Sequence, residues 1–393
     1  MRIALFTDCF TPIVNGVVTS TLNLVNGLAA RGHQVMLVSP DFGPGNLYEH
    51  PKVSHSVCRG LPALFHADFL TTAPLNASLF KAIKAFNPDL IHVQTPWTIG
   101  IQAVLISRLL NKPLVGTFHT FFSDPDYLKN VRLNNRYAAE AAERLCLFFY
   151  NKCDLVSAPS ISTLNDLEKQ GLKSSLVYIS NGIDGSKFDN SNAGTVRKLY
   201  ADEKTVLFLY VGRVAPEKNI FFLLQSLKEL KKDNYPFKLL IVGDGPDYTR
   251  AVDYIAREDL NDSVYMAGKI PYDKLIVSGI FGAADVFITA SKTENQPMTI
   301  LEAQINGLPV IGLKARGIPD LVIDGNNGLL SAADDQQAFL NNLKRVIDEP
   351  NLLKNLKMGS AEMIQDHALV NVIEKWEAAY SSTLRINRRR KVS

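Results

Sequence analysis

Short apolar runs alternate with amphipathic helical patterns along the whole chain, and this alternation restricts the possible folds more than any other feature. In the first half, the apolar runs that are typical of strands lie at residues 3–7, 35–39, 90–94, 114–117 and 155–158. Strands that alternate with helices at this spacing form βαβ units, in which helices cover both faces of a parallel sheet. The first half is therefore predicted to be a doubly wound α/β domain.

The alternation starts again after Asn181-Gly182-Ile183-Asp184, with apolar runs at residues 206–211, 237–242, 263–266, 286–289 and 309–312. A length of 393 residues is also typical of two domains. We expect a first domain over residues 1–188 and a second over residues 189–368, with a polar linker at 189–194. Residues 369–393 form the last part, a helix from about Asn371 to Arg385 and a basic tail.

Motifs and composition exclude several classes of ligand. No Gly-x-Gly-x-x-Gly follows a strand, because Tyr248 stands at the third glycine position after Gly243-Asp244-Gly245, and no P-loop motif is present. A net charge of +3, without basic segments interleaved with aromatic residues, argues against nucleic acid. The four cysteines have neither CxxC nor metal-ligand spacing, which is typical of reduced thiols in the cytoplasm. No apolar stretch reaches the ~20 residues that span a bilayer.

Two glutamates, Glu294 and Glu302, flank the expected start of a helix in the second half. They follow the apolar run at 286–289, and Pro297 between them is suited to the first turn of a helix, with Asn295 or Gln296 as the cap. A helix N-terminus attracts anions, and a rise of ~1.5 Å per residue separates the two carboxylates by roughly 12 Å. This arrangement suits a nucleotide sugar, whose diphosphate has a hydroxyl-rich sugar on either side. The alternative is that the two glutamates only happen to lie near a helix start.

A second candidate site follows the apolar run at 206–211. Arg213 and Lys218, five residues apart, lie in a loop at the expected carboxyl end of that strand. Arginine offers a planar fork of donors and lysine a mobile point charge, so together they are suited to a diphosphate. The alternative is a solvated loop in which Lys218 pairs with Glu217.

Taken in chain order, the motifs of this sequence resemble those of the retaining GT-B glycosyltransferases of family 4. The resemblance covers nearly the whole length of the chain. The motifs that carry the resemblance are residues 12–16 (PIVNG), 118–120 (FHT), 180–184 (SNGID), Gly212-Arg213 with Glu217-Lys218, 242–246 (VGDGP), and Glu294 with Glu302-Ala303 and 307–310 (GLPV). The resemblance implies a GT-B fold of two doubly wound Rossmann-like domains that face each other across a cleft. It also implies that the last helix crosses back to the N-terminal domain.

The resemblance further assigns a role to each candidate catalytic residue. Arg213 and Lys218 would hold the donor diphosphate and stabilise the charge that grows on the leaving phosphate. Glu294 would lie beside the transferred sugar, and Glu302 would accept hydrogen bonds from the ribose hydroxyls. His119 would project from the N-terminal domain toward the reacting sugar. In this scheme no metal ion and no cofactor is needed.

The remaining donor contacts are implied in the same way. Gly16 would let the backbone approach the donor phosphates, and the loop from Gly268 to Ile270 would line the base pocket. The implied donor-binding residues are Gly16, Arg213, Lys218, Gly268, Ile270, Glu294, Asn295, Met298, Thr299 and Glu302.

The chain departs from the family pattern in one place, and in another it matches a motif that is typical of a different class of glycosyltransferase. Gln296-Pro297 stand where family members often have Phe-Gly, so one backbone N–H to the donor is missing. Asp124-Pro-Asp126 matches the D-x-D motif of metal-dependent glycosyltransferases, but we interpret it as a loop or acceptor contact.

The acceptor is predicted from the segments around Pro12 and His119, which look most like those of bacterial enzymes that glycosylate diacylglycerol. Three segments could contact anionic lipid: the apolar loop expected at 61–70, the basic amphipathic stretch 129–152, and the basic tail 385–391. The alternatives are that the first two pack inside the domain and that the tail is solvated. The expected location is the cytoplasm, at the inner membrane face if the acceptor is a lipid.

The sequence thus predicts a hexosyltransferase that uses a nucleotide sugar, with UDP-glucose as the expected donor and a membrane lipid as the expected acceptor. A soluble or glycan acceptor is compatible with the same motifs. So are an epimerase or hydrolase on the same architecture, and a nucleotide-sugar-binding or partner subunit without turnover.

Overall fold

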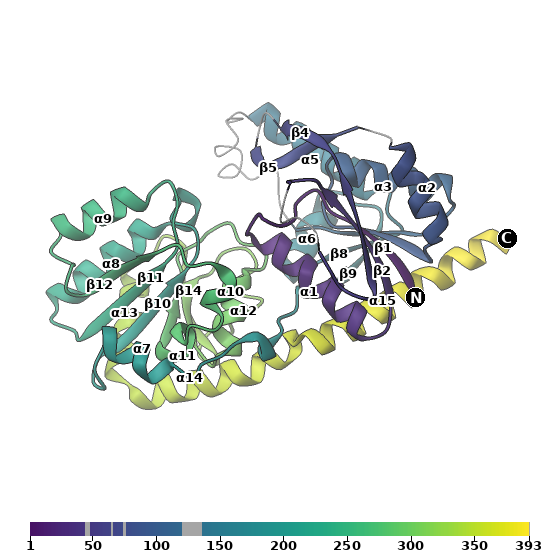
Figure 1. Ribbon diagram of the computed structural model, residues 1–393. Coiled ribbons are helices and arrows are strands. Elements are labelled where there is room, and N and C mark those ends of the chain that lie inside the picture. The colour runs from purple at the N-terminus through teal and green to yellow at the C-terminus, as the bar shows by residue number, and fades with distance from the viewer. Residues whose placement is uncertain (44–47, 64–65, 74–75, 120–135, 393) are drawn as a thin grey trace. The chain divides into compact units, whose positions relative to one another are not determined.

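The computed structural model describes residues 1–43, 48–63, 66–73, 76–119 and 136–392, which form two compact units (Figure 1). The first unit contains Met1–Gly182 and Leu369–Ser393, and the second contains Ile183–Ala368. The polar stretch at 189–194, expected to be a linker, is held within the second unit. There, the N–H of Asp189 donates to the carbonyl of Ile276 at 2.9 Å, and Asn190 Oδ1 accepts from the N–H of Gly282 at 3.1 Å.

The first unit is built on a seven-stranded sheet in which all strand pairs are parallel and the order is β3-β2-β1-β6-β7-β8-β9. Its strands are β1 (Arg2–Phe6), β2 (Gln34–Pro40), β3 (Val53–Cys58), β6 (Leu90–Val93), β7 (Leu114–Thr117), β8 (Leu155–Ala158) and β9 (Ser175–Tyr178). Its helices are α1 (Gly16–Ala30), α2 (Ala77–Phe86), α3 (Thr98–Leu109), α5 (Arg136–Tyr150), α6 (Ile161–Lys169) and α15 (Leu369–Val392).

The second unit is built on a six-stranded parallel sheet with the order β12-β11-β10-β13-β14-β15. Its strands are β10 (Val206–Val211), β11 (Phe237–Val242), β12 (Val264–Gly268), β13 (Val286–Ile288), β14 (Val310–Leu313) and β15 (Gly328–Ser331). Its helices are α7 (Ala193–Tyr200), α8 (Ile220–Lys232), α9 (Tyr248–Arg257), α10 (Tyr272–Leu275), α11 (Ile280–Ala283), α12 (Met298–Ile305), α13 (Gln336–Asp348) and α14 (Pro350–Met363), with single 3-10 turns at Gly185–Lys187, Pro216–Lys218 and Ile364–His367.

Each of the ten predicted apolar runs forms a strand because both faces of the central strands are buried, whereas β3, β9 and β15 were not predicted. Residues 3–6 of β1 and 207–211 of β10 are almost inaccessible to solvent, so each central strand is a continuous apolar run. The predicted fold class, two doubly wound Rossmann-like α/β units, is confirmed.

One expected loop is a hairpin instead. Residues 61–70 were expected to be loop-like, but β4 (Gly60–Ala63) and β5 (His66–Thr72) pair in antiparallel fashion, and residues 64–65 lie outside the described part of the chain. Leu61 on β4 is 76% exposed.

The last helix is longer than expected. The predicted helix from Asn371 to Arg385 begins at Leu369 and continues through the basic tail to Val392. In the first unit α15 contacts α1, where a Cβ added to Gly27 would lie 2.5 Å from Cγ1 of Ile373 (Figure 1). The core of the first unit includes four residues of this helix, Val372, Ile373, Trp376 and Tyr380.

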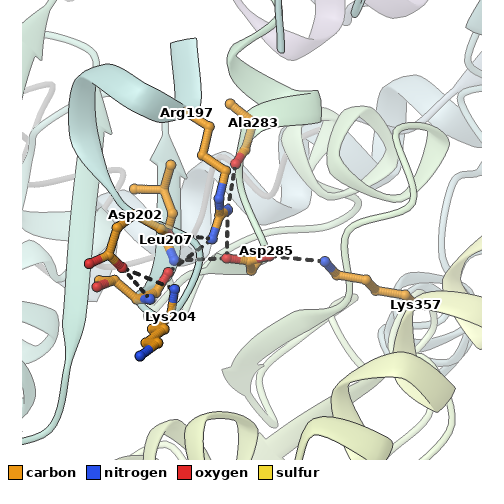
Figure 2. A network of polar contacts seen from close by, with 8 residues as sticks. Arg197, Asp202, Lys204, Leu207, Ala283, Asp285 and Lys357 are labelled. Atoms are coloured by element: carbon orange, nitrogen blue, oxygen red, sulfur yellow. Dashed lines mark hydrogen bonds and ion pairs between the residues drawn. The ribbon is translucent and has the colours of Figure 1, made fainter. Parts of the chain in front are cut away.

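A polar network ties α7 and α14 to the amino end of the second sheet (Figure 2). Asp285, directly before β13, accepts from Arg197 Nη1 at 2.8 Å, from Lys357 Nζ at 3.1 Å and from the N–H of Leu207 at 3.0 Å. This network stabilises the amino end of the sheet. It lies at the opposite end of the strands from the loops that carry the candidate site residues.

Candidate functional site

The candidate donor site of the second unit lies where the strand order reverses, between β10 and β13. In open α/β sheets the loops after two such strands diverge and leave a crevice at their carboxyl ends. The structure brings Lys218, from the loop after β10, into a hydrogen-bonded ion pair with Glu294, from the loop after β13. The hydroxyl of Ser291 also donates to the carbonyl of Glu217 at 3.3 Å. Two predicted site residues far apart in sequence therefore meet at the reversal.

Each predicted cation of this site has a carboxylate partner. Arg213 Nη1 lies 3.7 Å from Glu217 Oε1, so the pair is Arg213–Glu217 rather than the Lys218–Glu217 pair that the sequence left open. The side chain of Arg213 is 53% exposed, whereas those of Lys218 and Glu294 are 23% and 22% exposed. One cation is thus open to solvent, and the other is partly withdrawn from it.

Tyr210 on β10 supports the loop that carries Arg213. Its hydroxyl donates to the carbonyl of Arg213 at 2.8 Å. Burial, together with the nearby charges of Glu294 and Glu217, raises the pKa of Tyr210 well above its usual range, so the phenol stays protonated and keeps donating. No motif marks Tyr210 in the sequence, and its only signal is that it is a tyrosine within an otherwise apolar buried strand.

The glycines of the Gly243-Asp244-Gly245 turn allow two loops to pack closely. A Cβ added to Gly243 would lie 1.8 Å from the carbonyl oxygen of Gly212, and one added to Gly245 would lie 2.4 Å from that of Val214. The N–H of Val214 donates to the carbonyl of Asp244 at 3.0 Å. These glycines therefore hold the Arg213 loop against the loop after β11, which gives the turn a purpose other than binding a dinucleotide.

Glu302 lies on α12 and is 3% exposed. Burial raises the pKa of Glu302 to about 7, although a hydrogen bond from the Tyr272 hydroxyl opposes this shift. Tyr272 begins α10, two residues beyond the Gly268–Ile270 loop. Tyr272, which no sequence motif marks, therefore helps to fix the position of the Glu302 carboxyl group.

The start of α12 differs from the expected one. Pro297 itself is the cap residue, and no side chain caps the helix, so the expectation that Asn295 or Gln296 would do so was wrong. Asn295, Gln296 and Met298 are buried, whereas Thr299 is partly exposed. Because Pro297 carries no N–H, the helix start offers one donor fewer to an anion.

In the first unit, Gly16 begins α1 directly after its cap. Asn15 Oδ1 accepts from the N–H of Val18 at 3.0 Å, and Gly16 is exposed. An exposed glycine at a helix N-terminus is where backbone can approach a phosphate.

His119 follows β7 and contacts Gln94, which follows β6. The distance from His119 Nε2 to Gln94 Oε1 is 2.7 Å. Burial lowers the pKa of His119 to about 4, so the ring is neutral near pH 7. His119 can therefore donate or accept a hydrogen bond but adds no positive charge.

Asp8 fixes the loop after β6 and was not singled out from the sequence. Its buried carboxylate accepts from the N–H groups of Trp97, Ile99 and Gly100 at 3.1, 2.6 and 3.1 Å, and from Thr95 Oγ1 at 2.8 Å. Burial raises the pKa of Asp8 to about 6 despite these donors. Asp8 therefore caps the start of α3 and holds the β6 loop beside the end of β1.

Other expected residues divide between the two units or lie outside the structure. Arg213, Lys218, Glu294, Glu302, Gly268 and Ile270 belong to the second unit, and His119 and Gly16 belong to the first. Asp124 and Asp126 lie outside the described residues. Among the residues that are described, no group of three or more His, Cys, Asp and Glu side chains is placed to hold a metal ion.

Helix α5 lies within the stretch 129–152 that was expected to contact a lipid surface, and it has a buried and an exposed face. Phe149 and Tyr150 are buried in the core of the first unit, whereas Leu145 and Phe148 are 69% and 64% exposed. Lys152 Nζ lies 4.1 Å from the centre of the Phe148 ring. Residues 129–135 of the predicted segment are outside the described range, and within that range no helix is long and apolar enough to cross a bilayer.

Comparison with known proteins identifies both halves of the chain. Residues 14–187 match a family model described as Glycosyltransferase Family 4, and residues 195–363 match one described as Glycosyl transferases group 1. An alpha-monoglucosyldiacylglycerol synthase of Streptococcus pneumoniae is 29% identical over 84% of this chain and 75% of the relative. A GDP-mannose-dependent alpha-mannosyltransferase of Mycobacterium tuberculosis is 27% identical over 84% of this chain and 83% of the relative. The crystal structure of Anabaena Alr3699/HepE in complex with UDP is similar in fold, with a TM-score of 0.79 and 20% identity over 97% of this chain and 100% of that one.

Proposed function

Because the chain belongs to the GT-B glycosyltransferases of family 4, we propose that it transfers glucose from UDP-glucose to diacylglycerol or a related membrane lipid, with retention of the anomeric configuration. The family match makes the protein a glycosyltransferase, and the named relatives are hexosyltransferases. The donor, the acceptor and the stereochemistry are the proposal.

The observation that carries the proposal is the Lys218–Glu294 pair at the strand-order reversal. A donor diphosphate brings two negative charges that compete with Glu294 for the lysine. When Lys218 turns to the phosphate, the Glu294 carboxylate is released to accept hydrogen bonds from hydroxyls of the transferred sugar. The ion pair of the free protein thus supplies one group for each end of the glycosyl–phosphate bond.

Arg213 and Lys218 then assist departure of the nucleotide. Negative charge grows on the leaving phosphate as the bond to the sugar breaks, and cations already aimed at that position stabilise the transition state more than the ground state. Arg213 can hold the phosphate with its planar fork, and Lys218 acts as a point charge. In a retaining reaction the acceptor hydroxyl attacks on the face that the nucleotide leaves, and a leaving-phosphate oxygen takes its proton. This scheme requires positioning and cations rather than a metal ion.

Glu302 holds the other end of the donor. We infer that its buried carboxylate, which already accepts a hydrogen bond from Tyr272, also accepts hydrogen bonds from the two ribose hydroxyls. Carboxylate acceptors for hydroxyl pairs are strong because the hydrogen bonds are charge-assisted.

The lipid acceptor is supported by the pneumococcal relative, whose name states a glucosylated diacylglycerol, and by the exposed face of α5. Arg144 is exposed on the same helix as Leu145 and Phe148, so apolar and basic side chains are presented together. Such a combination binds the interface of anionic bilayers, where a lipid acceptor would be found.

A second candidate function is mannosyl transfer from GDP-mannose, because the mycobacterial relative is named for that donor at nearly the same identity. The same cations and the same ribose-binding carboxylate would serve either nucleotide. The two candidates differ only in the groups that meet the base and the sugar.

A donor screen on the purified full-length protein with mixed lipid vesicles tests both candidates. UDP-glucose, UDP-galactose, UDP-N-acetylglucosamine and GDP-mannose are each scored for released nucleotide and for labelled lipid. We expect labelled glucolipid with UDP-glucose alone, and NMR of the product should give the α-anomer. Nucleotide release without labelled lipid would overturn the lipid acceptor, and labelled mannolipid with GDP-mannose would favour the second candidate. A β-linked product would contradict retention.

A further inference from the structure

The carbonyl of Arg213 and the N–H of Val214 belong to one peptide unit, and both polar groups of that unit are held by hydrogen bonds. The Tyr210 hydroxyl donates to the carbonyl at 2.8 Å, and the N–H donates to the carbonyl of Asp244 at 3.0 Å. A planar peptide unit can reorient only by rotation about the backbone torsions on either side of it. Because such a rotation would break both hydrogen bonds, the backbone that follows the Cα atom of Arg213 is fixed from two sides.

Tyr210 reaches this peptide unit from the core of the second unit. It lies on β10, is 2% exposed, and packs in the same core cluster as Phe208, two residues earlier on the same face of the strand. A Cβ added to Gly212 would lie 3.0 Å from the Tyr210 hydroxyl oxygen, so the loop lies directly against the end of the phenol. A buried hydroxyl without a partner is costly, which favours the hydrogen bond to Arg213.

The phenol also lies near both ion pairs of the candidate site. Burial raises the pKa of Tyr210 above its usual range, and the charges of Glu294 and Glu217 raise it further. These two carboxylates are the partners of Lys218 and Arg213, respectively. Tyr210 thus belongs to neither ion pair but is close to the acid of each, and it keeps the proton that it donates.

We propose that Tyr210 is a positioning residue for the donor diphosphate: by holding the carbonyl of Arg213, it sets the direction in which the guanidinium leaves the loop. This inference rests on the proposed function, in which Arg213 holds the diphosphate, and it concerns residues of the second unit alone. The side chain of Arg213 is 53% exposed and lies 3.7 Å from Glu217, so the backbone directs it more than close packing does.

A loop that is ordered before the donor arrives binds a diphosphate more tightly than a loop that must be ordered on binding. Without the Tyr210 hydroxyl, the Arg213–Val214 peptide unit is held at one end only, and ordering it would oppose binding. The effect should need the phosphates, because Arg213 contacts only these in the proposed function. Uridine, which lacks the diphosphate, is therefore the comparison ligand for UDP.

Calorimetric titration of the purified full-length protein with UDP and with uridine tests the proposal. Tyr210→Phe removes the hydroxyl and keeps the ring, so that the packing of the core is preserved. We expect the affinity for UDP to fall roughly 3-fold to 10-fold, the loss expected for one net hydrogen bond, and the affinity for uridine to stay unchanged. Unchanged affinity for UDP, or equal losses for UDP and uridine, overturns the proposal.

Ser226→Ala is the matched control. Ser226 lies on α8 of the same unit, is fully buried, and donates to the carbonyl of Phe222 at 2.8 Å. The variant therefore removes a buried hydroxyl that donates to a backbone carbonyl, but on a helix rather than beneath a site loop. We expect it to bind UDP like the parent. A loss equal to that of Tyr210→Phe assigns the effect to the core and overturns the positioning role.

Amide hydrogen exchange of the free protein tests the loop without a ligand. In Tyr210→Phe we expect the N–H of Val214 to exchange faster than in the parent, because local opening of the loop breaks one hydrogen bond fewer. In Ser226→Ala the exchange rate at Val214 should equal that of the parent. An unchanged rate in Tyr210→Phe would mean that the hydroxyl does not hold the loop, and it overturns the proposal.

Arg213→Ala separates failure of this inference from failure of the proposed function. If Arg213→Ala keeps the parent's preference for UDP over uridine, or if the parent has none, the proposed role of Arg213 is wrong and the positioning role is overturned with it. If Arg213→Ala loses that preference and Tyr210→Phe keeps it, only the positioning role is overturned. The double variant should bind UDP like Arg213→Ala, because Tyr210 acts through Arg213. A further loss of affinity in the double variant contradicts this coupling and overturns the proposal.

Discussion

Replacing Lys218 with alanine removes one of the two cations that we propose for the leaving phosphate, and the exposure of Lys218 allows the cost to be worked out. Lys218 and Glu294 are 23% and 22% exposed, so the local environment lies between bulk water and a dry interior. Two unit charges 4 Å apart at an effective dielectric of about 20 interact with about 4 kcal/mol. Loss of a single donor to a developing oxyanion costs about 3 kcal/mol, which is roughly a 100-fold fall in kcat. The Coulomb energy of the charge pair and the cost of losing an oxyanion donor are therefore similar in size.

The assay is release of nucleotide from the donor identified by the screen, with kcat and the donor KM measured for parent and variant. Because Arg213 remains as the second cation of the proposed phosphate site, we expect most of the loss in kcat and less in KM. Lys231→Ala is the matched control: Lys231 lies on α8 of the same unit, pairs with Asp259 at 3.2 Å and Asp262 at 2.8 Å, and belongs to neither site loop. Melting curves of both variants check that the fold is intact.

Turnover of Lys218→Ala within a factor of about three of the parent, less than 1 kcal/mol, would refute the assignment of the site. Equal losses in Lys218→Ala and Lys231→Ala would also refute it, because the effect would then follow stability rather than charge at the phosphate.

Three further predictions concern the pH response, the stability of the second unit and the membrane. Burial raises the pKa of Glu302 from 4.5 to about 7, so its stabilising contribution is full below pH 4.5 and is lost as the pH rises through about 7. As the pH rises from 4.5 to about 7, the melting temperature of the parent should therefore fall more than that of Glu302→Gln. Equal falls for the two proteins would contradict the burial argument. Asp285→Asn, which uncouples Arg197 and Lys357, should lower the free energy of unfolding by about 3 kcal/mol in urea titrations, and a change below about 1 kcal/mol would mean that the network is dispensable. Leu145→Glu combined with Phe148→Glu should reduce co-sedimentation with anionic vesicles, whereas undiminished binding would rule out this face of α5.

The architecture could be predicted from the sequence because buried parallel strands are recorded as continuous apolar runs. The runs at 114–117, 206–211 and 237–242 match β7, β10 and β11 in full. The β4–β5 hairpin was missed because β4 has only four residues and contains Pro62. The length of α15 was underestimated because a run of arginines looks like a solvated tail, although arginine is a good helix former.

The candidate site could be predicted only in part, because many of its contacts join residues from different elements. Lys218 and Glu294 were identified, but nothing in the sequence shows that they pair. Tyr272 and Gln94 were missed since each is a single polar residue outside any motif, and each acquires its meaning from a partner on another element. The cap of α12 was misassigned because Pro297 was expected inside the helix.

The position of α15 in the first unit also determines the order in which the protein can be assembled during synthesis. Val372, Trp376 and Tyr380 are core residues of a unit whose other part ends at Gly182, so the ribosome must add the whole of the second unit before that core can close. Domains generally fold as units in the order in which they emerge. Here the second unit is complete first, and the core of the nascent first unit stays exposed where α15 will pack against it. Fusing the sequence of α15 directly after residue 182 should therefore yield a first unit that folds alone, whereas residues 1–182 by themselves should not.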